Sequence, residues 1–67
     1  MPRPHQRYLR VDASMVEVGD VLYWGRWRLR CIAVQIFGDT EVLVQRGDQR
    51  LLLHERELWC LPRPVQR

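Results

Sequence analysis

The sequence predicts a single all-β domain, a small five-stranded barrel with one short helical turn before its last strand. Three observations support this prediction. Short runs of strand-favouring residues alternate with Gly-containing turn signals about every ten residues. The chain has 67 residues, which is enough for one core and too few for two. A barrel suits this length better than a sandwich, because closing the sheet removes edges that a small sheet must otherwise protect.

The first strands follow from composition and from glycine positions. Val16–Asp20 reads as a lead-in and turn, and Val21–Trp24 as a strand of strand-favouring residues. Gly25 and Arg26 interrupt that strand. A long strand over Trp27–Phe37 is expected next.

The face of this long strand that carries the apolar residues changes along its length. Its first half alternates, so three arginines share one face and three apolar residues share the other. The basic face holds Arg26, Arg28 and Arg30, and the apolar face holds Trp27, Leu29 and Cys31. Farther along, the apolar residues Ile32, Val34 and Ile36 occupy the face that carried arginines. We therefore expect a bent strand that passes from one side of the barrel to the other.

The rest of the chain repeats short strands and tight turns, and then ends with one helical turn and a closing strand. The expected elements are a turn at Gly38-Asp39, a strand over Thr40–Gln45, a turn over Arg46–Gln49, a strand over Arg50–His54, a helical turn over His54–Glu57 and a strand over Leu58–Leu61. Within Thr40–Gln45, Val42 and Val44 are expected on one face.

Proline-bearing segments flank this pattern. Pro2 and Pro4 lie near the start of the chain, and Pro62 and Pro64 lie near its end. We therefore expect a flexible basic arm over residues 1–7, the barrel over 8–61 and a flexible tail over 62–67.

The order of these pieces resembles an SH3-like small barrel of the Tudor or KOW type. The pieces that carry the resemblance are Gly19-Asp20, Gly25 to Phe37, Gly38-Asp39, Gly47-Asp48, His54 to Glu57 and Leu58 to Leu61. The resemblance covers about three-quarters of the chain and concerns the fold. It implies a binding module for nucleic acid, peptides or other proteins.

The basic residues are the main functional signal. All 11 of them are arginine, and the formal net charge is +3. On a strand, Arg26, Arg28 and Arg30 would lie about 6.6–7 Å apart, which is close to the phosphate spacing of an extended nucleic-acid strand. Trp24, beside a glycine turn, is expected to stack on a base. Arg46 and Arg50 are expected to extend the patch.

The same features suit a second partner class. Arginine next to an exposed tryptophan is typical of protein interfaces, so an acidic protein surface is the alternative to RNA or DNA. The protein would then be a small subunit, or an inhibitor encoded by a phage or mobile element. Homo-oligomerisation also fits so small a core. Trp27 is expected in the core, and Trp59 is a further core candidate.

Other function classes lack support. Ser14 is the only serine, His54 is expected at the surface, and no nucleophile with an orienting base is visible, so we expect no enzyme and no cofactor. Cys31 and Cys60 lack close zinc-ligand spacing, so we expect no metal and reduced, packed thiols. No apolar run reaches the ~20 residues of a membrane span, and no signal peptide is visible. A cytoplasmic, non-membrane protein is therefore expected.

Overall fold

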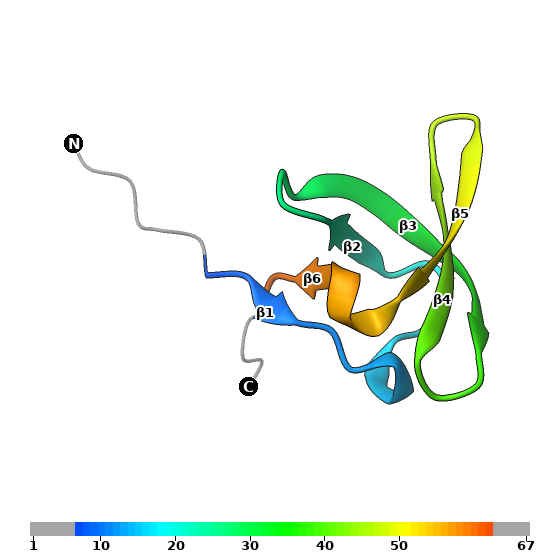
Figure 1. Cartoon of the computed structure of the whole chain (residues 1–67), viewed down its shortest axis with the longest axis horizontal. Coiled ribbons are helices and arrows are strands. Elements are labelled where there is room, and N and C mark those ends of the chain that lie inside the picture. Colours follow the sequence, from blue (N-terminus) through cyan, green and yellow to red (C-terminus); the bar gives the residue numbers. More distant parts are fainter. Residues whose placement is uncertain (1–6, 63–67) are drawn as a thin grey trace, which may run out of the picture.

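The computed structural model describes residues 7–62 as one antiparallel sheet with two short 3-10 helices (Figure 1). The all-β class predicted from the sequence is confirmed. The elements are β1 (Leu9–Arg10), η1 (Ala13–Met15), β2 (Val21–Trp24), β3 (Leu29–Phe37), β4 (Glu41–Arg46), β5 (Gln49–His54), η2 (Glu55–Glu57) and β6 (Leu58–Cys60). The predicted arm and tail lie outside the described residues, apart from Arg7 and Pro62.

The sheet has six strands in the order β1-β6-β2-β3-β4-β5, where the sequence predicts five. The additional strand is β1, which pairs with the outer side of β6. Because β1 and β5 end this order without pairing to each other, the sheet is not closed, contrary to the predicted full barrel. Figure 1 shows that the sheet is strongly curled, so that β4 and β5 stand across the direction of β2 and β6.

The predicted change of facing in the long strand is produced by a bulge. Ala33 faces Val44 and Gln35 faces Leu43, so Val34 has no direct partner on β4. Such an extra residue shifts the alternation by one position and bends the strand. Before the bulge Cys31 and Ala33 are buried, and after it Ile36 packs against the core. Ile32 precedes the shift, shares the outer face with Arg30 and is 41% exposed.

The core is small and aliphatic. Its buried members are Val11, Ala13, Leu22, Cys31, Ala33, Val42, Val44, Leu53 and Leu58. Val42 and Val44 share one face, as predicted, and both are fully buried. At Ala13 and Ala33 the small side chains leave room for the segment before β2 to approach β3, and backbone hydrogen bonds join Gly19 N to Ala33 O and Ala33 N to Asp20 O.

Both 3-10 helices are capped by side chains. The Asp12 carboxylate accepts hydrogen bonds from the backbone N–H and the hydroxyl of Ser14, at 3.1 and 2.7 Å. The His54 Nδ1 accepts from the Arg56 N–H at 3.1 Å and caps η2. The helical turn expected over His54–Glu57 is therefore present as a capped 3-10 helix. Among residues 7–62 no helix has the length and apolar character needed to cross a membrane.

Candidate functional site

A row of register partners crosses β1, β6, β2 and β3. The partners are Arg10 with Trp59, Trp59 with Tyr23, and Tyr23 with Arg30. Direct partners in antiparallel strands project from the same face of the sheet, with Cβ atoms about 5 Å apart. Since Trp59 follows the fully buried Leu58 along β6, the row lies on the face opposite the core. Cations stand at its two ends and aromatic rings in its middle.

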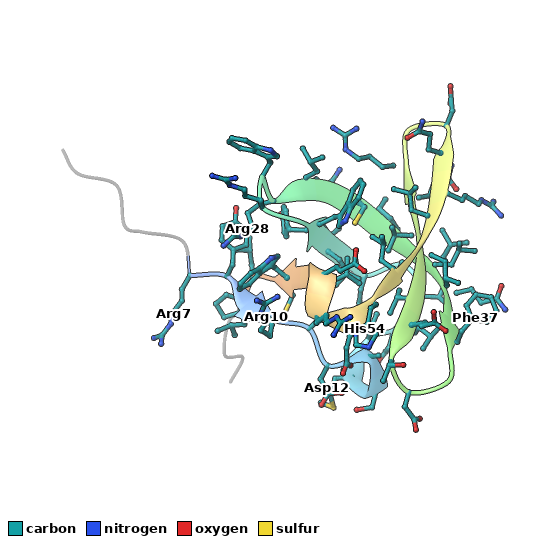
Figure 2. All side chains as sticks on the ribbon, in the orientation of Figure 1. Arg7, Arg10, Asp12, Arg28, Phe37 and His54 are labelled. Atoms are coloured by element: carbon teal, nitrogen blue, oxygen red, sulfur yellow. The ribbon has the colours of Figure 1, made fainter. Side chains whose placement is uncertain are left out.

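Arg28 and Tyr8 complete this surface. The guanidinium carbons of Arg10 and Arg28 lie 4.0 and 4.1 Å from the centroid of the Trp59 ring. Arg28 also lies 5.3 Å from the Tyr8 ring, and Tyr8 meets Tyr23 edge to face at 5.3 Å between centroids. We call this surface the arginine–aromatic face; it consists of Tyr8, Arg10, Tyr23, Arg28, Arg30 and Trp59. Figure 2 shows Arg10 and Arg28 on the side of the molecule opposite to Phe37, whereas Arg7 lies farther out and points away from them.

The position of Arg28 depends on an unusual backbone. Its φ is +54°, the left-handed region that L-residues with a Cβ rarely adopt. Its N–H donates to Gly25 O at 3.2 Å and closes the turn between β2 and β3, and its Nη1 donates to Arg26 O at 2.8 Å. Its Nε is buried without a hydrogen-bond partner. The turn thus holds a cation against the ring of Trp59.

The positive charge of this face is balanced elsewhere in the fold. Arg3, Arg63 and Arg67 lie outside residues 7–62, whereas all eight acidic residues lie within them, so the described part has no net formal charge. Arg10 and Arg28 donate to the backbone oxygens of Arg56 and Arg26, which are neutral acceptors. These contacts orient the two guanidinium groups and leave their charges in place.

The prediction that Arg26, Arg28 and Arg30 form a row along one strand is wrong. β3 begins at Leu29, so Arg26 and Arg28 belong to the preceding turn and only Arg30 lies on a strand. Arg28 and Arg30 nevertheless both belong to the arginine–aromatic face, Arg28 over the Trp59 ring and Arg30 as the register partner of Tyr23. Arg26 lies apart, with its guanidinium carbon 5.5 Å from the Trp27 ring.

The burial of the three tryptophans, and the face on which each lies, differ from the prediction. Trp27, expected in the core, is 78% exposed because it lies at the tip of the turn. Trp24 is half-buried, and it packs against the core on the inner face rather than on the arginine–aromatic face. Trp59, a predicted core candidate, is half-buried on the outer face beneath Arg10 and Arg28.

Arg46 and Arg50 lie at the β4–β5 hairpin. Arg50 faces Gln45 and donates from Nε to its Oε1 at 3.3 Å. The register runs from Val21 through Ile32 and Gln45 to Arg50, so Arg50 continues the outer face toward the far edge of the sheet. Arg46 follows Gln45 and projects from the other face of the strand.

Four members of the face were missed at the level of sequence, namely Tyr8, Arg10, Tyr23 and Trp59. Tyr23 and Trp59 each follow a buried leucine, so the alternation of their strands carried a usable signal. Tyr8 and Arg10 carried none, because a two-residue strand beside a proline-rich arm has no readable period.

The thiols belong to the core rather than to this face. Cys31 is buried, its Sγ lies 3.5 Å from Leu22 O, and burial raises the pKa of its thiol. Both Cys31 and Cys60 are free thiols. Within residues 7–62, no three His, Cys, Asp or Glu side chains gather in a way that could hold a metal ion.

Comparison with protein-family models, curated proteins and solved structures finds no match for this chain. Function therefore has to be argued from the arrangement of side chains. Stacked rings and guanidinium groups can receive flat π systems, and exposed guanidinium groups can pair with phosphate or carboxylate.

Proposed function

We propose that the protein is a non-enzymatic binding module that holds single-stranded nucleic acid on the arginine–aromatic face. The observation that supports this proposal is the row that joins Arg10, Trp59, Tyr23 and Arg30 across four strands. Proteins that bind single strands combine cations along the backbone with flat groups on which bases stack. This face supplies both within one continuous patch.

Each part of the face has a role in this proposal. Arg10 and Arg30 are exposed at the two ends of the row and pair with phosphates. Tyr23 and the guanidinium plane of Arg28, which the Trp59 ring supports from beneath, offer π surfaces to unpaired bases. A duplex keeps its bases stacked inside and leaves these surfaces unused, which favours a single strand.

We also infer that the fold is SH3-like. Five of the strands follow the order β6-β2-β3-β4-β5, and a 3-10 turn precedes the last of them along the chain. This agrees with the order of pieces on which the resemblance rests. β1 is then an addition on the free side of β6.

Binding of fluorescein-labelled oligonucleotides, measured by anisotropy, tests the proposal. Single-stranded RNA, single-stranded DNA and duplex DNA are compared from 50 to 200 mM salt. The site variant is Arg10→Gln/Arg30→Gln. The control is Arg46→Gln/Arg50→Gln, which removes the same charge at the β4–β5 hairpin, outside the face. We expect the site variant to lower the salt slope by about 1.4, since each phosphate contact on a single strand contributes about 0.7.

If the salt slope falls equally in both variants, net charge alone explains the effect and the proposal is contradicted. Tighter binding of duplex than of single strands would also contradict it. A Trp59→Leu variant checks the stacking role separately, with an expected loss of about 1–3 kcal/mol in the binding free energy of single strands.

The second candidate function is binding to an acidic protein surface, and the exposure of Trp27 favours it. Trp27 stands at a turn tip beside Arg26, and a buried Trp with a neighbouring Arg is a frequent energetic centre of protein interfaces. This candidate predicts no oligonucleotide binding at low salt. It also predicts capture of a protein partner that Trp27→Ser abolishes and that salt weakens little.

A further inference from the structure

A recessed surface lies between β1, η1, β2 and the end of β6, beside the arginine–aromatic face. It is a groove of about 410 Å³. Its floor includes the buried Val11 and Leu22, and Met15 stands at its rim. Tyr23 lines it from the side that adjoins the arginine–aromatic face.

Apolar side chains are unusually exposed around this groove. Residues 7–62 contain eight large apolar side chains that are exposed, and three of them line it: Leu9 at 41%, Met15 at 74% and Val21 at 38%. Contiguous apolar exposure of this kind marks interaction sites on soluble proteins. Met15 is the most exposed of the three, and the described part of the chain covers Leu9 and Val21 only in part.

The charge of the groove has one sign. Its charged lining residues are Asp12 and Asp20, and none of the described arginines lines it. Asp12 accepts both of its hydrogen bonds from Ser14, and these bonds lower the pKa of its carboxyl group, so it stays ionised at neutral pH. An ionised carboxylate beside apolar side chains attracts cations and repels phosphates.

The strand β1, which contributes Leu9 to the groove, is an edge strand of the sheet. β1 is the first strand in the sheet order and pairs only with β6. An extended segment can lie along such an edge, while alternate side chains enter the adjacent groove.

We propose that this groove binds an extended peptide segment of a partner protein that presents aliphatic side chains together with an arginine or lysine. The aliphatic side chains cover Met15, Leu9 and Val21, and the basic group pairs with Asp12. The proposal does not depend on nucleic-acid binding, because the acidic groove and the basic face call for ligands of opposite charge.

Three labelled pentapeptides test it: Leu-Val-Arg-Leu-Val and its versions with Gln or Glu in place of Arg. The full-length wild type is compared with Asp12→Asn, which keeps a capping residue on η1. The matched control is Asp39→Asn, which removes an exposed charge at the β3–β4 turn, outside the groove lining.

We expect the affinity order Arg, Gln, Glu for the wild type. Asp12→Asn should weaken the Arg peptide about two- to fivefold, the range of an exposed ion pair, and leave the Gln peptide unchanged. Asp39→Asn should change neither the affinity for the Arg peptide nor that for the Gln peptide. Met15→Gln should weaken all three peptides, while far-UV circular dichroism shows each variant folded.

Absence of peptide binding, or equal affinity for the three peptides, overturns the proposal. Two results would overturn it by assigning the groove to another occupant. Self-association that Met15→Gln abolishes would assign it to a second copy of the chain. Tighter peptide binding after deletion of residues 63–67 would assign it to the C-terminal segment of the same chain.

Discussion

Arg28 combines a backbone that disfavours its side chain with contacts that need that side chain. A residue with a Cβ in the left-handed region is destabilised by roughly 1–2 kcal/mol relative to glycine. The contacts with Trp59 and Tyr8 and the hydrogen bond to Arg26 O offset this strain. Such strain, retained at a surface rich in rings and cations, is consistent with a role for the side chain in binding.

Two substitutions at Arg28 separate the backbone from the side chain. Both Arg28→Ala and Arg28→Gly lose the stacking contacts, but only glycine relieves the strain at φ +54°. We expect Arg28→Gly to be more stable than Arg28→Ala by about 1 kcal/mol in urea unfolding. Equal stabilities of the two variants would show that the turn relaxes and that no strain is stored there.

Cys31 makes the free energy of unfolding depend on pH in the alkaline range. Burial raises the pKa of its thiol, and a weaker effect of Arg46 opposes this. The unfolded thiol ionises near pH 8.5. Between that value and the raised folded pKa, the folded state keeps a proton that the unfolded chain has released, so stability falls as pH rises. Below pH 8.5 the contribution is fully present.

We therefore expect the difference in unfolding free energy between wild type and Cys31→Ala to shrink from pH 7 to pH 10. Urea titrations at both pH values measure it, and Cys60→Ala serves as the control for a partly exposed thiol. A constant difference would mean that the buried thiol does not titrate differently from the unfolded one.

At the residue level, the sequence pattern singles out Arg28 and Arg30 but does not predict how they are arranged around Trp59. Alternation predicts Trp27 in the core only if a strand begins at residue 27, whereas β3 begins at Leu29. A left-handed residue at Arg28 breaks that alternation, and nothing in the local composition signals a left-handed arginine. The stacking of Arg28 on Trp59 joins residues 31 positions apart and arises only in the tertiary structure.

Among the elements, η1 and η2 are joined by a partly buried hydrogen bond. The Ala13 N–H donates to the Glu55 carboxylate at 2.8 Å, and Ala13 is 1% exposed. The Glu55 N–H in turn donates to Thr40 O at 2.7 Å. One glutamate therefore ties the segment before β2 to the turn that leads into β6.

Removal of this carboxylate would leave a buried N–H unpaired. We expect Glu55→Ala to lower the free energy of unfolding by about 1–3 kcal/mol. Glu55→Gln retains an acceptor oxygen and should recover most of the loss. Glu57→Ala is the matched control, because Glu57 is an exposed glutamate of the same 3-10 helix. The Glu57 backbone oxygen, which this substitution keeps, accepts a hydrogen bond from the Gly25 N–H. Similar losses at both glutamates would contradict the role of the Ala13 contact.

The elements themselves follow the sequence closely, for a clear physical reason. Val21–Trp24 is a strand as predicted, and the strands around Gly38 and Gly47 agree with prediction to within two residues, since glycine turns and alternating valines are local signals. β1 and η1 are too short to show a period. They form because Val11 and Ala13 are drawn into the core, which is a non-local cause.

For the whole molecule, the open sheet leaves two unequal edges. β1 offers two residues, whereas β5 offers six, including Leu52 at 53% exposure. A long edge strand with an exposed leucine is a template for pairing with another chain. Ile32 on the interior strand β3 is paired on both sides, with Val21 and Gln45, and presents no such template.

We expect any reversible self-association of the full chain to proceed through β5. Leu52→Lys should then reduce it by about tenfold or more in sedimentation equilibrium, because an edge lysine must be desolvated when strands pair. The matched control is Ile32→Lys, which adds the same charge on the outer face of the interior strand β3. Equal effects of the two lysines would indicate simple charge repulsion. Weaker association in Met15→Gln alone would move the contact from β5 to the groove beside β1, because Met15 lies on η1 and lines that groove.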